Sequence, residues 1–257
     1  QGHHARLRET MQTFTDGLLA STPPIPGLDR TIVIPPRRLH FTLGVMSLDR
    51  VPDAPASSEA PAPERPRRTL EAAKQVLNEL KPKIAETLGR EKLRVKLDRM
   101  DIMKPERRDQ ERANVMWVGP SLDGESANRL KTTIADMIVK AFTEAGLLVD
   151  EKRPLKASAT DRREQLHCTV LNTIYRKPRG KMRTPFSYPS VLASEAFKAV
   201  LAPPQPRGEA AETAGKAGGG PVRVDFGEWE IDEVQICEMG SWGPEGEYVA
   251  VHRVALG

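Results

Sequence analysis

Two stretches of this sequence share a short pattern, "RLHFTLGVMSL" at residues 38–48 and "QLHCTVLNTIY" at residues 165–175. In each stretch, Leu-His is followed by one variable residue, then by Thr, and then by an apolar residue. The two copies lie in opposite halves of a chain of 257 residues. Short runs with this character predict β-strands, so we expect both copies to lie on strands.

On a strand, successive side chains point to opposite faces, so each His shares a face with the Thr two residues later. His40 and Thr42 would form one polar pair, and His167 and Thr169 would form the other. A rise of about 3.3 Å per residue separates the members of each pair by about 6.6 Å along the backbone, so their side-chain tips can converge on one anion. Two such strands side by side would surround one phosphate with two imidazoles and two hydroxyls.

This set of groups suits displacement at phosphorus. The reaction needs a base on the attacking oxygen and an acid on the leaving oxygen, on opposite sides, so it needs two groups. An unperturbed histidine pKa of about 6.5 lets both protonation states exist near neutral pH, and Thr hydroxyls can donate hydrogen bonds to the non-bridging oxygens. The scheme requires no metal or other cofactor, and it leaves open which His is the base. A competing interpretation is that both His residues are ordinary hydrogen-bonded residues of a sheet.

Basic and aromatic residues flank both copies of the pattern. The stretch "RKPRGKMR", which begins at Arg176, holds five positive charges and no negative charge. We predict that Arg176 and Lys177, together with Arg38, contact phosphates of a substrate, although a solvated basic loop fits the pattern equally well. Tyr175 and Trp117 are candidates to stack on a base, and such residues are also common in cores.

The remaining sequence predicts an α+β protein. Apolar stripes with helical spacing predict helices at residues 5–21, 69–89, 126–146 and 187–201. Strand patterns occur at residues 31–34, 39–45, 93–103, 113–120, 222–239 and 246–256, besides the second copy of the pattern. The order of these elements predicts two sheets, each backed by helices.

Residues 51–66 are rich in Pro, Ala and Ser, and residues 202–221 are rich in Pro, Ala and Gly, so we expect both stretches to be insertions of the disordered type. The rest forms a single domain over residues 1–257 in our interpretation. We expect a monomer.

Composition limits the class of protein. Lys and Arg number 39 against 35 Asp and Glu, which permits an anionic ligand without indicating a protein that coats nucleic acid. The two cysteines, Cys168 and Cys237, lack metal or redox spacing, so we expect reduced thiols and a cytoplasmic or nuclear location. No apolar run reaches the roughly 18 residues of a membrane span, so we expect no membrane partner. His3 and His4 are expected to be mobile residues without a metal role.

At the paired motifs, the sequence resembles the 2H phosphoesterase superfamily, which is defined by two His-x-Ser/Thr motifs on strands of a bilobal fold. "PPRRLHFTLGVMSL", "EQLHCTVLNT" and "IPGLDRTIVIP" resemble its branch named for an A-kinase anchoring protein and the activating signal cointegrator complex. The resemblance implies two antiparallel sheets lining a central cleft, with helices on the outside. It also implies that His40 and His167 are catalytic and that Thr42 and Thr169 bind phosphate, with no metal or cofactor.

The activity implied by this resemblance is cleavage of a ribose-linked phosphodiester, either a 2′,3′-cyclic phosphate or a 2′-5′ linkage, so RNA or a ribonucleotide is the expected partner. Two other functions compete with it. One is a nucleotide- or RNA-binding module without activity, which could tolerate loss of the His and Thr residues. The other is a kinase-anchoring scaffold that uses the stripe at residues 126–146, although a face that covers a sheet explains this stripe more simply. No residue identifies a protein partner.

Overall fold

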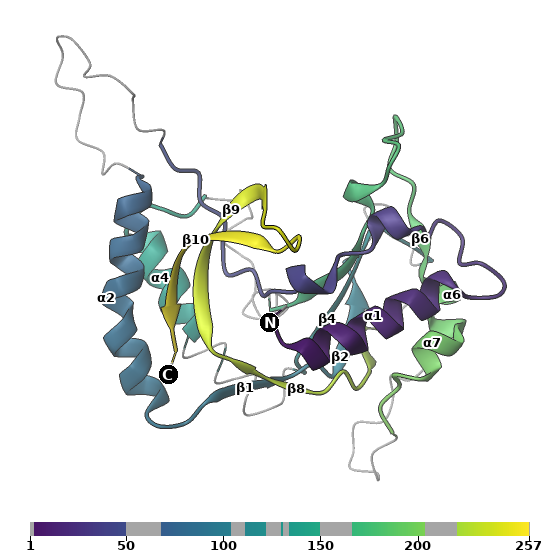
Figure 1. The fold of residues 1–257 in the computed structure, drawn as a ribbon, viewed down its shortest axis with the longest axis horizontal. Coiled ribbons are helices and arrows are strands. Elements are labelled where there is room, and N and C mark those ends of the chain that lie inside the picture. Colours follow the sequence, from purple (N-terminus) through teal and green to yellow (C-terminus); the bar gives the residue numbers. More distant parts are fainter. Residues whose placement is uncertain are drawn as a thin grey trace.

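A computed structural model describes residues 3–49, 68–103, 111–121, 130, 134–149, 166–203 and 220–256. Within these ranges the protein has a mixed α+β architecture, as predicted (Figure 1). The α-helices are α1 (Ala5–Leu19), α2 (Leu70–Leu88), α4 (Asp136–Glu144), α6 (Tyr188–Ala193) and α7 (Glu195–Lys198). Short 3-10 helices are η1 (Arg30–Ile32), η2 (Pro36–Arg38) and η4 (Thr173–Tyr175). The strands are β1 (Leu93–Lys96), β2 (Arg99–Ile102), β3 (Arg112–Ala113), β4 (Val115–Gly119), β5 (Cys168–Asn172), β6 (Phe186–Ser187), β7 (Val222–Arg223), β8 (Glu228–Ile231), β9 (Glu233–Trp242) and β10 (Tyr248–Ala255).

The buried apolar residues form two cores, which lie in the right and left halves of Figure 1. Core I joins α1, α6 and α7 to β2, β4 and β5. Core II joins α2 and α4 to β1, β9 and β10. Phe41, which follows the first His, packs against both cores. The first motif therefore lies where the two halves meet.

The helices follow the predicted stripes. In α1, the four apolar residues at three- and four-residue steps are all buried, namely Leu7, Met11, Phe14 and Leu18. Helix α2 begins after Thr69, whose hydroxyl accepts a hydrogen bond from the Ala72 amide at 3.1 Å, and it ends at Gly89 with φ +61°. The predicted helix at residues 126–146 is confirmed in its described part by α4, and Gly146 follows it with φ +67°.

The strands form one four-stranded sheet, β5-β4-β2-β7, and three two-stranded sheets, β1-β8, β9-β10 and β3-β6. The predicted pairing between β2 and β4 is confirmed, but the prediction of two sheets is wrong. The predicted strand at residues 93–103 is interrupted at Leu97 and Asp98, so its halves enter different sheets. Asp98 is buried there, and its carboxylate accepts hydrogen bonds from the amide and hydroxyl of Ser121 at 2.6 and 2.8 Å.

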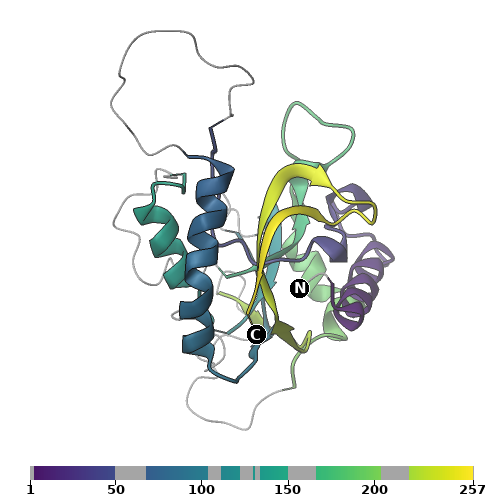
Figure 2. The same cartoon turned by 60° about the vertical axis from the view of Figure 1, so that its left-hand side comes forward.

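The strand pattern at residues 222–239 is interrupted as well. Gly227 has φ +85°, a conformation that favours glycine, and it separates β7 from β8. Its carbonyl accepts a hydrogen bond from the Leu97 amide at 2.9 Å, so the two interruptions lie side by side. Strands β9 and β10 pair as the predicted hairpin, which curves across the molecule between α2 and α1 (Figure 2).

The chain around His40 lies outside the assigned strands, which corrects the prediction for residues 39–45. The Ile34 amide still donates to the Val170 carbonyl at 2.9 Å, and Val33 bridges antiparallel to Leu171. Pro35 and Pro36 follow, and neither has an amide hydrogen, so the ladder stops and the chain turns through η2. The predicted strand at residues 31–34 is likewise replaced by η1 and this single bridge.

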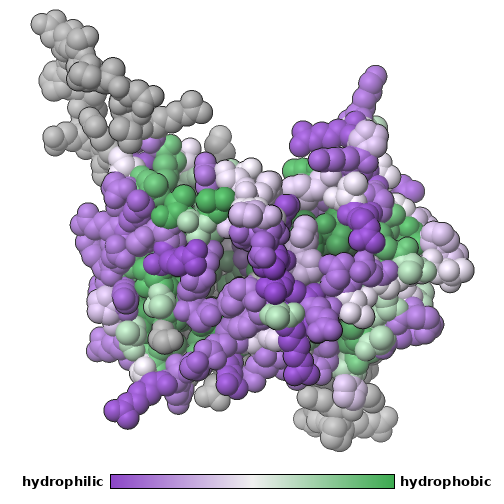
Figure 3. Space-filling view, in the orientation of Figure 1, coloured by the Kyte–Doolittle hydropathy of each residue, from purple (hydrophilic) through white to green (hydrophobic). Residues whose placement is uncertain are grey.

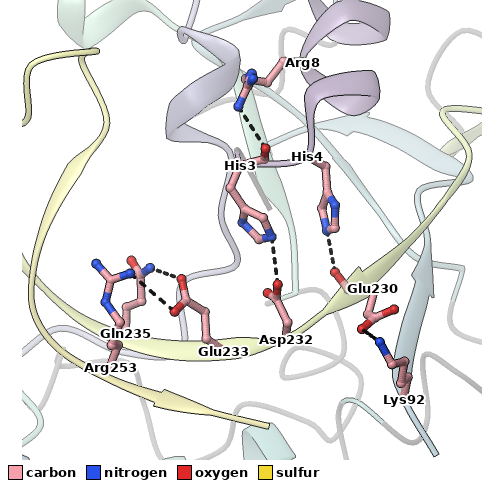
Figure 4. Close-up of polar contacts among 9 residues, drawn as sticks. All are labelled: His3, His4, Arg8, Lys92, Glu230, Asp232, Glu233, Gln235 and Arg253. Carbon is pink, nitrogen blue, oxygen red and sulfur yellow. Dashed lines mark hydrogen bonds and ion pairs between the residues drawn. The ribbon is translucent and has the colours of Figure 1, made fainter. Parts of the chain in front are cut away.

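His3 and His4 are ordered against the β8–β9 junction, contrary to the expectation that they are mobile (Figure 4). The Nε2 atom of His3 lies 3.1 Å from Oδ2 of Asp232, and Nε2 of His4 lies 2.8 Å from the carbonyl oxygen of Glu230. The His4 ring also lies 5.7 Å from the ring of Trp229, centre to centre. These contacts attach the start of α1 to the far end of the chain.

Residues 51–66 and 204–219, which hold nearly all of the two predicted insertions, lie outside the described ranges. Of the helices that the structure describes, none combines the length and the apolar content required to cross a lipid bilayer.

Candidate active site

The ring of His40 is held by hydrogen bonds at both nitrogens. Nδ1 lies 2.7 Å from the carbonyl oxygen of Arg38, and Nε2 lies 3.0 Å from Oγ1 of Thr42. A carbonyl oxygen can only accept, so Nδ1 carries the hydrogen. In the neutral ring, Nε2 therefore presents a lone pair, and the Thr42 hydroxyl donates to it. This arrangement confirms that His40 and Thr42 share one face of the chain.

Burial lowers the pKa of His40 below the usual value of 6.5, because the charged ring loses solvation. The hydrogen bond to the Arg38 carbonyl opposes this effect, since it stabilises the charged form, but it is the smaller influence on the pKa. His40 is thus neutral over a wider range of pH than a solvated histidine. A neutral imidazole with an Nε2 lone pair is the form that acts as a general base.

Aromatic side chains of the β9–β10 hairpin extend in a row from His40, with Tyr248 first and Trp242 next. The ring of Tyr248 contacts His40 edge-on at a centre-to-centre distance of 4.8 Å, and Trp242 lies 4.9 Å beyond Tyr248. Burial raises the pKa of Tyr248, and the nearby Tyr175 side chain raises it further. Tyr175 is the last residue of η4, directly after β5. The first motif is therefore linked through Tyr248 to the strand that carries the second motif.

Two arginines attach the tip of the β9–β10 hairpin to η2. The guanidinium carbon of Arg38 lies 3.5 Å from the ring centre of Trp242, and its Nε donates to the Gly246 carbonyl at 2.6 Å. Arg37 forms an ion pair with Glu245. The side chain of Arg38, predicted to contact substrate, thus contacts the hairpin, while its carbonyl orients His40. The structure gives Arg38 a positioning role.

The second motif shows the predicted alternation. Leu166, Cys168 and Val170 are buried, whereas His167 and Thr169 are half-buried on the other face. Burial raises the pKa of the Cys168 thiol to about 12, so this cysteine stays protonated. His167 immediately precedes β5, which is an edge strand of the four-stranded sheet and pairs with β4.

Strand β4, which pairs with β5, places a large aromatic side chain beside His167. Trp117 pairs with Thr169, and its ring lies 5.7 Å from that of His167. Trp117 is only 7% exposed, which agrees with the interpretation of this residue as a core aromatic and not with stacking on a base. At Gly119, a Cβ atom would lie 2.7 Å from the Leu166 carbonyl oxygen and 3.5 Å from the His167 Cα. Only glycine therefore permits this close approach of the two strands.

Both motifs lie on segments that pass from one core to the other. The chain leaves core I at Leu39 and reaches core II at Leu43, and His40 lies between them. The second segment runs in the opposite sense, from Leu166 in core II to Cys168 in core I, with His167 between. Because Val33–Ile34 and β5 are antiparallel, the chain from Ile34 proceeds toward the end of β5 where His167 lies. Both histidines thus belong to the boundary between the cores.

Arg176 is engaged within the protein. Its guanidinium forms an ion pair with Asp29 and donates to the carbonyls of Gly27 and Thr184, the latter at 3.1 Å. These donors join the loop before η1 to the segment after β5. Arg176 therefore has a structural role here, and its guanidinium does not face a substrate as predicted. The side chain of Lys177, by contrast, is exposed, although its backbone amide donates to the Thr31 hydroxyl at 3.0 Å.

Sequence reasoning missed the hairpin residues Trp242 and Tyr248 and the glycine at position 119. Tyr248 lies on a predicted strand, whereas Trp242 was placed in the predicted turn and is instead the last residue of β9. The contact of Tyr248 with His40 depends on how the hairpin folds over the first motif. Gly119 ends a strand pattern, "ANVMWVGP", in which glycine looks like a simple terminator. Over the ranges that the structure covers, no three His, Cys, Asp or Glu side chains gather into a set that could hold a metal ion.

A search of curated proteins finds no match to this chain. A protein-family model described as "AKAP7 2'5' RNA ligase-like domain" matches residues 3–256. The match includes both His-x-Thr motifs and the β9–β10 hairpin that contacts His40. Because it spans nearly the whole chain, the protein belongs to the AKAP7 2'5' RNA ligase-like domain family.

Proposed function

We propose that this protein is a phosphodiesterase that acts on 2′,3′-cyclic phosphates or 2′-5′ linkages of ribonucleotides, with His40 as the general base and His167 as the general acid. One observation carries the assignment of roles. The Nδ1 hydrogen bond of His40 to the Arg38 carbonyl, together with burial, presents a neutral Nε2 lone pair beside Thr42. Membership of the family and the duplicated motif support the reaction class.

In the proposed reaction, Nε2 of His40 takes a proton from a water molecule or from a neighbouring ribose hydroxyl. The resulting oxygen nucleophile forms a bond to phosphorus, and the bond from phosphorus to the leaving ribose oxygen breaks. Protonated His167 gives its proton to that leaving oxygen, and proton exchange with water then returns both imidazoles to their starting states. Neither step uses a metal ion.

The two threonines stabilise charge on the non-bridging oxygens in this scheme. In the structure, the Thr42 hydroxyl donates to Nε2 of His40. A bound phosphate and the attacking oxygen would replace this contact, so that the hydroxyl can donate to phosphate and the nitrogen can accept a proton. Thr169 performs the same role from β5.

The test is incubation of the protein with a 2′,3′-cyclic mononucleotide and with 2′-5′ diadenylate, each in the presence of EDTA. We expect turnover by the native chain and a loss of at least about 10²-fold in kcat for His40→Ala and for His167→Ala. His252 offers a matched control, because it lies on β10 and its Nε2 is 3.0 Å from Oδ1 of Asn78, in contact with α2. His252→Ala should keep native activity.

Abolition of turnover by EDTA would contradict the mechanism. Tight binding of either nucleotide without turnover, unchanged in both variants, would instead identify a binding module.

A further inference from the structure

The loop that follows η4 projects from the half of the molecule that holds core I, and Figure 3 shows it as a hydrophilic protrusion at the upper right. Its side chains from Lys177 to Thr184 are exposed. Four of them are cations, namely Arg183 and the three residues Lys177, Arg179 and Lys181, and the span from Ile174 to Thr184 contains no acidic residue. We call Lys177, Arg179 and Lys181 the basic arm.

The base of this loop is fixed by polar contacts with the rest of the protein. Arg176 joins it to Asp29, Gly27 and the Thr184 carbonyl, and its side chain is only 20% exposed. At the other end, Arg183 donates to Oδ1 of Asn172 at 3.1 Å, on the last residue of β5. The loop is therefore held in a defined direction, which a merely solvated loop does not require.

The charge of the basic arm is not compensated. Among the described residues, the side chains of Lys177, Arg179 and Lys181 form no ion pair or hydrogen bond. Large apolar side chains are exposed beside them, with Met182 at 77%, Ile174 at 51% and Tyr175 at 40%. Cations interleaved with exposed aromatic and apolar surface are typical of sites for single-stranded nucleic acid.

The basic arm is also adjacent to the proposed active site. Tyr175, which precedes the arm in the chain, lies near Tyr248, and Tyr248 contacts the ring of His40. A ribonucleotide chain cleaved at His40 would carry further phosphates. Tyr175 and then the basic arm are the next residues that such a chain would reach from His40 and Tyr248.

We propose that the basic arm binds the phosphates of a single-stranded ribonucleotide chain that extends from the active site, so that the protein prefers an oligonucleotide to a dinucleotide. This inference rests on the proposed function for the position of the scissile phosphate. The class of ligand is a polyanion with unpaired bases: the arm contacts the backbone, and Tyr175 provides a stacking surface.

The first measurement is binding without turnover. A labelled single-stranded oligoribonucleotide of about ten nucleotides is titrated by fluorescence anisotropy into His40→Ala protein at several salt concentrations. Adding Arg179→Ser and Lys181→Ser should weaken binding about tenfold and reduce the slope of log K against log salt by about 1.4, because each cation that neutralises a phosphate contributes about 0.7 to this slope. The matched control carries Lys81→Ser and Lys83→Ser on the exposed face of α2, which removes the same charge near core II. It should bind as the parent does.

The second measurement compares substrates. In protein with native His40, the arm substitutions should lower kcat/KM about tenfold for a 2′-5′ oligoadenylate of about ten nucleotides and leave kcat/KM for 2′-5′ diadenylate within about twofold. Equal losses on both substrates, or an unchanged salt slope, would overturn the arm's role. Absence of turnover on every substrate would contradict the proposed function alone, because the binding measurement does not depend on it.

Discussion

His40 shows how one backbone contact determines the chemistry of a side chain. The Arg38 carbonyl is two residues away and can only accept a hydrogen bond, so it fixes the hydrogen on Nδ1. The same residue attaches the β9–β10 hairpin through its guanidinium. A substitution at Arg38 is therefore expected to act through the placement of His40.

At this scale, the prediction concerns pH. Because burial lowers the pKa of His40 below 6.5, the rising limb of kcat/KM against pH should have its midpoint below 6.5, where the base becomes deprotonated. The rate should fall again at higher pH, because the acid must keep its proton. Tyr248→Ala exposes His40 to water and should move the rising limb upward, toward 6.5.

Tyr248→Phe is the control for this measurement, since it retains the ring and should leave the rising limb in place. A rising limb above 6.5 in the native protein would contradict the role of His40 as a buried base.

Among the elements, β4 and β5 depend on glycine for their close approach. A Cβ atom at position 119 would lie 2.7 Å from a backbone oxygen, so Gly119→Ala must displace the segment that carries His167. We expect a loss of roughly 1–3 kcal/mol in the free energy of unfolding from overpacking. Because a displacement of about 1 Å can cost about 10²-fold in rate, we also expect kcat to fall by roughly 10- to 100-fold. Urea unfolding and steady-state kinetics measure the two effects.

Gly17→Ala separates the loss of stability from the loss of activity. Its Cβ atom would lie 2.9 Å from the Cβ of Ala196, between α1 and α7 and away from both motifs. It should destabilise the protein while kcat stays native below the unfolding transition. Native kcat in Gly119→Ala would show that β4 does not position His167.

The elements also show what local patterns can predict. Helices α1 and α2, the glycines that end α2 and follow α4, and the strand that carries Thr169 agree with the sequence, because hydrophobic period and capping act locally. The interruptions at Asp98 and Gly227 depend on contacts between distant segments, such as Leu97 to Gly227, and no local pattern contains them. The polar faces of both motifs were predictable for the same local reason, whereas the aromatic neighbours of His40 were not.

The whole molecule consists of two cores joined at the chain around Phe41, which packs against both. Phe41→Ala removes this shared contact. We expect it to lower the free energy of unfolding by roughly 2–3 kcal/mol, below the 3–5 kcal/mol typical of a fully buried Phe, because Phe41 is half-buried. Activity should fall beyond what unfolding explains, since the substitution loosens the segment between His40 and Thr42.

Phe41→Leu provides the comparison, because a smaller apolar side chain keeps part of both contacts and should cost less than Ala in both measurements. Calorimetry and kinetics on the same preparations test this prediction. Equal stability and kcat in native, Ala and Leu proteins would show that Phe41 neither stabilises the junction of the two cores nor positions His40.

The opposed courses of the two motif segments have a mechanical consequence. Each histidine lies on a short segment whose two ends are buried in different halves of the molecule. A hinge-like rotation between the halves would therefore move both imidazoles at the same time, because both connecting segments cross the boundary between the cores. A compound wedged into that joint at the aromatic side chains of the hairpin would disable the chemistry without blocking either ring.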